Sequence, residues 1–132
     1  MISAKFLAIV GGMSLLLAEA VSANAAAATL RVRCEVRGNR SKISVDGKRI
    51  KNFSGLVHAV VTSTNGLGEV SADFKPIVLR QVEFDFDSDD DDIMDGAKAI
   101  PADFIDRNDP HVTANIPELG LSSKTATCRV RK

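Results

Sequence analysis

The stretch LRVRCEVR, residues 30–37, decides the fold class of this 132-residue chain. Apolar residues stand at every second position, Cys34 among them, and charged residues stand between them. A period of two is typical of a β-strand with one buried face. The C-terminal stretch ATCRVR, residues 126–131, repeats the alternation and again carries its cysteine, Cys128, on the apolar side. Both stretches are therefore predicted to be strands that contribute to one core.

Cys34 and Cys128 are the only cysteines in the chain. Their sulfurs lie on the apolar faces of their strands, so they can meet inside the core, and we predict that they form a disulfide. Such a bridge closes most of the chain, and the chain-entropy model gives it on the order of 4–5 kcal/mol. It also requires an oxidising compartment.

Residues 1–25 are predicted to be a secretory signal peptide. Lys5 is followed by a charge-free run of 13 residues, and small residues stand at Ala23 and Ala25. The run is shorter than the roughly 20 apolar residues that span a bilayer, so we expect cleavage rather than a membrane anchor. The prediction is a secreted or periplasmic protein whose residues 26–132 form a single β-sandwich domain.

The chain between the two cysteine strands carries further strand and turn signals. The dipeptides Asp46-Gly47 and Asn65-Gly66 are typical of tight hairpin turns. Short helical structure is expected only within residues 89–106. Further strands are predicted at residues 56–64, 70–74, 77–87 and 111–116, and the alternation within 77–87 is clearest from Val82 onward. The pattern predicts an all-β fold, an antiparallel immunoglobulin-like sandwich or small barrel of six to seven strands.

Charge is balanced in total and divided along the chain. The net charge is zero, yet residues 26–53 carry eight basic side chains and two acidic ones. Residues 83–109 carry eleven acidic side chains and two basic ones. A division of this kind favours contacts between surfaces of opposite charge.

The acidic stretch EFDFDSDDDDIMDG, residues 83–96, has three open interpretations. Hydrated or internally paired charge is preferred. A Ca²⁺ site and a surface for a cationic partner are the alternatives, and the EF-hand spacing fails in both registers for lack of the required Gly and Glu. The candidate metal ligands are Asp85, Asp87, Asp89, Asp91 and Asp92.

The basic stretch supplies three candidate partner-binding residues, Arg31, Arg33 and Arg37. They could contact a polyanion, or they could form the exposed side of a strand, which is preferred. Stacking aromatic residues are missing from the stretch, so nucleic acid is not expected as the partner.

Catalytic patterns are missing from the sequence. His58 and His111 are the only histidines, and no G-x-S-x-G motif occurs. We therefore expect an exported, non-enzymatic binding or structural module with no cofactor other than Ca²⁺, and with a protein or polyionic surface as its partner. The alternative is an assembly subunit whose divided charge drives head-to-tail self-association.

Overall fold

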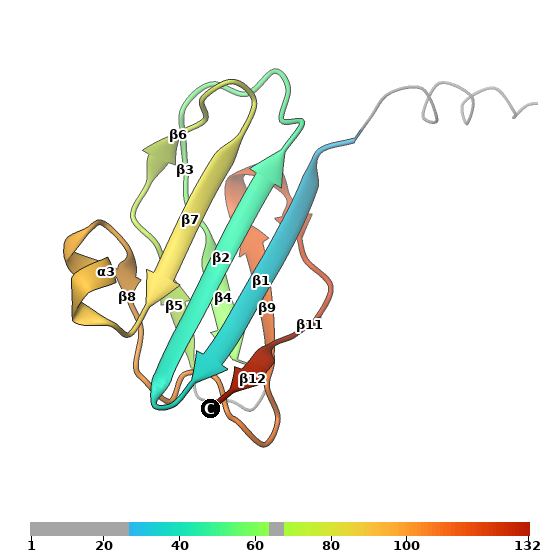
Figure 1. The fold of residues 1–132 in the computed structure, drawn as a ribbon. Coiled ribbons are helices and arrows are strands. Elements are labelled where there is room, and N and C mark those ends of the chain that lie inside the picture. The colour runs from blue at the N-terminus through green and yellow to red at the C-terminus, as the bar shows by residue number, and fades with distance from the viewer. Residues whose placement is uncertain (1–26, 64–67) are drawn as a thin grey trace, which may run out of the picture.

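The structure is a computed structural model that describes residues 27–63 and 68–132. The predicted signal peptide, residues 1–25, and the predicted turn at Asn65-Gly66 lie outside the described residues. Within them the chain folds as a β-sandwich, which confirms the predicted fold class (Figure 1).

The first sheet has the strand order β12-β1-β2-β7-β8. Its strands are β1 (Thr29–Arg37), β2 (Arg40–Lys48), β7 (Val82–Asp87), β8 (Lys98–Ala99) and β12 (Arg129–Arg131). The three long central strands are antiparallel, whereas β12 and β8 run parallel to their neighbours. The sheet is therefore mixed, which the prediction of a purely antiparallel fold did not include.

The second sheet has the order β10-β9-β4-β5, and β11 also pairs with β9. Its strands are β4 (Val60–Ser63), β5 (Glu69–Ser71), β9 (His111–Ile116), β10 (Leu121–Ser122) and β11 (Ala126–Thr127). A two-stranded ribbon joins β3 (Leu56–Val57) to β6 (Lys75–Pro76). The helices of the described residues are α3 (Asp90–Met94), inside the range predicted to be helical, and the 3-10 helix η2 (Pro117–Leu119).

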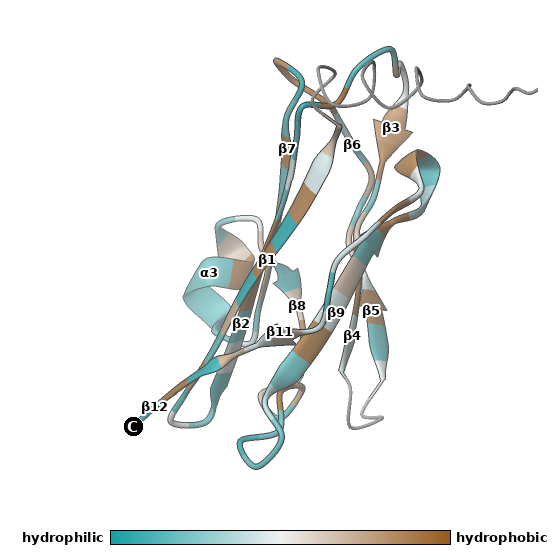
Figure 2. Ribbon diagram, turned by 90° about the vertical axis from the view of Figure 1, so that its right-hand side faces the viewer, coloured by the Kyte–Doolittle hydropathy of each residue, from teal (hydrophilic) through white to brown (hydrophobic). Residues whose placement is uncertain are grey.

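The core lies between the two sheets, which Figure 2 shows edge-on. Alternation places the apolar side of each long strand inward, as the sequence predicts. Phe84 and Phe86 from β7 are fully buried there, with Ile43 and Val45 from β2. Five of the described strands have four residues or more, β1, β2, β4, β7 and β9, and the other seven are pieces of two or three residues, among them those at the predicted strands 70–74 and 126–131.

The predicted hairpin turn at Asp46-Gly47 is wrong, because β2 continues through both residues. The β1–β2 turn instead lies at Gly38-Asn39, where Gly38 has a φ of +58°. Gly47 stands between Leu30 and Val82 on the neighbouring strands. A Cβ added there would lie 3.2 Å from Val82 Cγ1, so packing explains this glycine better than turn geometry.

Cys34 and Cys128 form the predicted disulfide. Cys34 lies in β1, and Cys128 is the single residue between β11 and β12. The chain passes there from the second sheet to the first, so the bridge fastens this crossover to β1. In the part of the chain that the structure describes, no helix has both the length and the apolar character to cross a membrane.

Candidate functional site

The outer face of the first sheet gathers charged side chains from four strands. Alternation directs these side chains away from the core, and the strand register sets them in rows across the sheet. The rows are Arg31–Asp46–Glu83, Arg33–Ser44–Asp85 and Arg129–Glu35–Lys42–Asp87. Each row runs from an arginine on β1 or β12 to a carboxylate on β7, so the face has a basic half and an acidic half.

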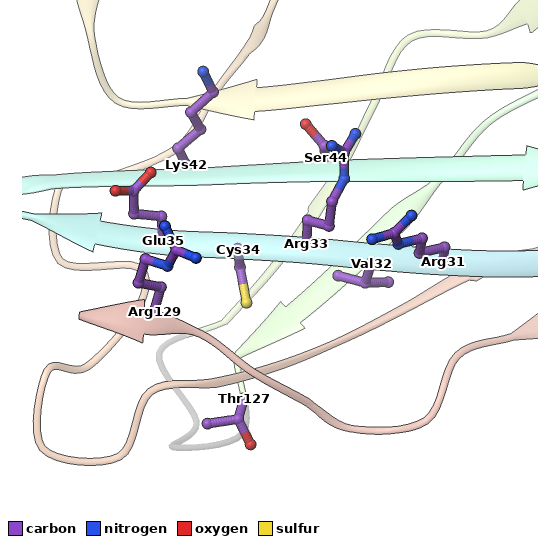
Figure 3. Close-up of a pocket in the computed structure, with 9 residues that line it drawn as sticks. All are labelled: Arg31, Val32, Arg33, Cys34, Glu35, Lys42, Ser44, Thr127 and Arg129. Atoms are coloured by element: carbon purple, nitrogen blue, oxygen red, sulfur yellow. The ribbon is translucent and has the colours of Figure 1, made fainter. Parts of the chain in front are cut away.

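The basic half consists of five arginines and contains one acid, Glu35. The arginines are Arg31, Arg33 and Arg37 from β1 and Arg129 and Arg131 from β12. Glu35 pairs with Arg131 at 3.3 Å and with Arg37 at 3.6 Å. A hollow of about 550 Å³ opens among Arg31, Arg33 and Arg129 (Figure 3). The five arginines outnumber the two acids that pair with them, Glu35 and Asp46, so the hollow is a cationic surface.

The acidic half consists of Glu83 and Asp85 from β7, Asp92 from α3, and Asp95 just after it. These side chains line a second hollow of about 560 Å³, together with buried Asp87 and two lysines, Lys42 and Lys75. The Ser44 hydroxyl donates a hydrogen bond of 2.9 Å to Asp85. Carboxylates outnumber lysines around the hollow, so it favours a positively charged ligand.

One residue of the acidic run is buried, and a single arginine holds it. Asp87 is 1% exposed and accepts two hydrogen bonds from Arg40, at 2.9 Å from Nε and 2.7 Å from Nη2. The same Nη2 donates to Asp92 on α3. The backbone N–H of Asp89 also donates to Asp87, at 3.0 Å. Arg40 therefore ties the end of β7 to the helix that follows.

The pKa values of the two carboxyl groups move in opposite directions. Burial would raise the pKa of Asp87, but hydrogen bonds from Arg40, Asp92 and Asp89 lower it to about 2. The pKa of Asp92 is raised, chiefly by its contact with the Asp87 carboxylate. Hydrogen bonding to Asp87 raises the pKa of Arg40. Asp87 therefore stays ionised to lower pH than an isolated aspartate, and Asp92 takes up a proton more readily than an isolated aspartate.

The five candidate metal ligands do not point to one centre. Asp85 faces solvent on β7, while Asp87 and Asp92 bind Arg40. Asp89 occupies the N-cap position of α3 without a side-chain capping hydrogen bond, and Asp91 lies exposed in the first turn of the helix. Across residues 27–63 and 68–132, no three potential ligand side chains are grouped to hold a metal ion.

Arg40 is the residue that the sequence interpretation missed. The candidate arginines Arg31, Arg33 and Arg37 are not neighbours of the acidic strand, because β2 lies between β1 and β7. Arg40 starts β2 directly after the Gly38-Asn39 turn, where its side chain reaches the end of β7. A turn at Gly38-Asn39 was readable from the sequence, whereas the pairing of β2 with β7 was not.

The two histidines lie apart from this face, each beside a carboxylate. His58 contacts Glu118 through its ring at 2.6 Å and through its backbone N–H at 3.0 Å. Burial would raise the pKa of Glu118, but these hydrogen bonds lower it. His111 contacts Asp109 at 2.7 Å. Each histidine is therefore held in the fold by a neighbouring carboxylate.

Fold and face together define a disulfide-linked β-sandwich with one charge-divided outer surface. No family model, no curated protein and no solved structure matches the chain. The function of the chain is therefore inferred from the geometry of this surface.

Proposed function

We propose that this protein is an exported, non-enzymatic binding module that engages a basic protein surface through its acidic half. The observation that supports this proposal is a hollow on one sheet face that five carboxylates line. Arg40 pairs with two of them, Asp87 and Asp92, and the others, Glu83, Asp85 and Asp95, remain on an exposed, pre-formed surface. Export is supported by the signal-like residues 1–25 and by the disulfide.

A basic protein surface suits the acidic half better than Ca²⁺ does. Calcium prefers six to eight oxygen ligands around one point, whereas these carboxylates are spread along β7 and α3. Asp87, the most buried carboxylate, already has Arg40 as its cation. Spread charge is suited to several lysines or arginines on an extended partner.

Calorimetry with a poly-lysine peptide tests the proposal. Replacing Asp85 and Asp95 by Asn removes two exposed charges from the hollow and leaves Asp87 with Arg40. We expect binding to weaken by about fivefold or more, since each contact of this kind is worth on the order of 0.5–1 kcal/mol. The matched control replaces Glu69 by Gln and Asp103 by Asn, two exposed acids outside the hollow. Equal binding by both variants would contradict the proposal.

Calcium is the competing ligand, and thermal melting separates it from the peptide. If the protein has the proposed function, millimolar CaCl₂ and NaCl at matched ionic strength should change the melting temperature equally, because both salts only screen the repulsion between the carboxylates. A rise specific to Ca²⁺ that disappears when Asp89 and Asp91 are replaced by Asn would instead assign the acidic run to the ion.

Self-association is the second candidate, because the basic and acidic halves share one face. Two copies that stack these faces about a two-fold axis parallel to the strands place each basic half over an acidic half. Such a pair satisfies both halves at once, whereas a head-to-tail chain leaves one half open at each end. The two hollows have similar volumes, about 550 and 560 Å³.

Charge reversal tests this assembly. Arg31→Glu with Arg129→Glu leaves three arginines against three glutamates in the basic half, and Asp85→Lys with Asp95→Lys leaves three carboxylates against four lysines around the acidic hollow, so each variant loses one of the two charged halves. Sedimentation velocity at low salt should show dimers of the unchanged protein, monomers of each variant alone, and restored dimers when the variants are mixed. A monomeric unchanged protein at every ionic strength removes this candidate.

A further inference from the structure

A second surface lies at the end of the sandwich where β2 ends and β7 begins, at the top of Figure 1. The loop after β2 and the loop before β7 meet there, because the backbone N–H of Ile50 donates to the carbonyl of Arg80 at 3.1 Å. We name this surface the apical tip. It consists of Lys48, Arg49, Lys51, Val78, Leu79 and Arg80.

Apolar side chains are concentrated at the apical tip and beside it. Leu79 is 89% exposed and Val78 is 62% exposed. Leu56 and Phe74, on or beside the adjoining β3–β6 ribbon, are more than half exposed as well. These four are most of the large exposed hydrophobic residues among residues 27–63 and 68–132, and Figure 2 shows apolar colour in the loop before β7. Such a concentration at one end marks an interaction surface.

The apical tip carries positive charge and no acid of its own. Residues 47–57 and 74–82 contain five basic side chains and no Asp or Glu. The acids that border these ranges are Asp46, Asp73 and Glu83: Asp46 pairs with Arg33 at 3.1 Å, Asp73 pairs with Lys98 at 3.3 Å, and Glu83 lies within β7. A hollow of about 400 Å³ opens at the tip, lined by Thr29, Lys48, Arg49, Leu79, Arg80 and Gln81. Its lining is suited to an anionic head group.

The turn that presents Leu79 is unfavourable for its own residues. Val78 and Gln81 exchange two backbone hydrogen bonds of 2.9 and 3.0 Å around a two-residue loop. Leu79 and Arg80 in that loop have φ angles of +53° and +65°. This is the turn that favours Asn-Gly, and side chains such as leucine cost conformational energy in it. The cost is not recovered by burial of Leu79, so folding does not explain this choice of residues.

We propose that the apical tip docks on an anionic lipid surface, with Leu79 and Val78 entering the interface and the four cations contacting head groups. Exposed apolar side chains ringed by lysine and arginine are the chemistry that such a surface recognises. A soluble polyanion would use the cations alone and would leave Leu79 without a role. The docking is peripheral and is independent of the charge-divided face, which lies on a different surface.

Vesicle binding of the full chain tests the proposal. Leu79→Asn with Arg80→Gly gives the turn its favoured residues, so we expect the melting temperature to rise. The same variant should lose binding to mixed phosphatidylcholine–phosphatidylglycerol vesicles by on the order of fiftyfold, about fivefold from the cation and about tenfold from the leucine. The control, Val130→Asn with Lys132→Gly, removes one exposed apolar residue and one cation at the opposite end, and should bind unchanged.

A tryptophan reporter makes the test local, because the chain has no Trp. Emission from Leu79→Trp should shift to the blue with anionic vesicles and stay constant with phosphatidylcholine alone or with dextran sulfate. Emission from Val130→Trp should not change. The proposal is overturned if Leu79→Trp does not respond, if dextran sulfate gives the same response, or if the Asn-Gly variant binds vesicles as tightly as the unchanged protein.

Discussion

Arg40 is the residue on which the acidic end of the first sheet depends. Its guanidinium is shared between Asp87, which is buried, and Asp92, which lies on α3. A buried carboxylate without a partner is costly, so the arginine is required wherever Asp87 remains ionised. The aspartate run is therefore partly an internal ion pair and partly a free surface.

Replacing each aspartate of this cluster in turn separates their roles. Asp87→Asn leaves Arg40 without its main acceptor and should destabilise the fold by about 2–3 kcal/mol, less than a fully buried pair, because Arg40 is 33% exposed. Asp92→Asn removes a like-charge contact with Asp87 and should not lower stability at neutral pH. Chemical unfolding followed by circular dichroism measures both. Equal losses would show that the two carboxylates act as one unit.

The neighbours of Gly47 leave no room for a larger side chain at this position. A Cβ at this position would lie 3.2 Å from Val82 Cγ1 and 3.3 Å from both Ile50 Cδ1 and Ile116 Cδ1. Gly47→Val should therefore overpack the core and destabilise it by about 1–3 kcal/mol. The control Lys48→Val, at the exposed next position of β2, should change stability by less than about 0.5 kcal/mol. Melting temperatures of the two variants provide the comparison.

At the scale of elements, the disulfide decides how the C-terminal strand is held. β12 pairs with β1 over three residues, Glu35 to Arg37, and Cys128 precedes it directly. A three-residue edge strand contributes few hydrogen bonds of its own. The bridge to Cys34 therefore holds β12, and with it Arg129 and Arg131 of the basic half.

Removing the bridge should lower stability and loosen β12 first. The free energy of unfolding should fall by about 2–5 kcal/mol in Cys34→Ser, in Cys128→Ser and in the double variant. The double variant should lose no more stability than either single variant, since all three remove the same cross-link. Hydrogen exchange should rise at Arg129, Val130 and Arg131 before it rises in β2. Two free thiols on the denatured, unreduced protein would contradict the pairing.

At the scale of the whole molecule, carboxylates set the acid limit of the fold. The pKa values of Asp87 and Glu118 are lowered in the folded state, so both stabilise it above their ordinary pKa values. That stabilisation is lost as pH falls from about 4 towards 2, and Asp87 accounts for about 2 kcal/mol of it. Asp92 has the opposite sign, because its pKa is raised, and offsets part of the loss.

Denaturant unfolding between pH 7 and pH 2 checks this expectation. Stability should be nearly constant down to about pH 5 and should then fall. Glu118→Gln should flatten the acid slope, because its hydrogen bonds with His58 no longer depend on ionisation of the carboxyl group. Circular dichroism is the suitable probe, since the chain has no Trp or Tyr. An unchanged acid slope in Glu118→Gln would show that the Glu118 carboxylate does not contribute to the loss of stability at low pH.

Local pattern was enough to predict much of this protein. Alternation along LRVRCEVR depends only on neighbouring residues, and it identified β1, its inward face and the Cys34–Cys128 pair. The predicted strand ATCRVR is instead divided into β11 and β12 around Cys128, and Val130 of its apolar side is 45% exposed. The charge division was likewise countable before any fold was known. These properties follow from which side of a strand faces the core, and a period of two encodes that side directly.

Strand order is a property of the folded chain, because sheet neighbours are chosen by long-range pairing. Placing β2 between β1 and β7 gives Asp87 to Arg40 rather than to the arginines of β1, and it converts Gly47 from an apparent turn residue into a packing contact. The same pairing brings Leu79 and Arg80 beside the loop after β2 and forms the apical tip. Residues far apart in sequence meet only when the sheets close, and no local period records which of them will.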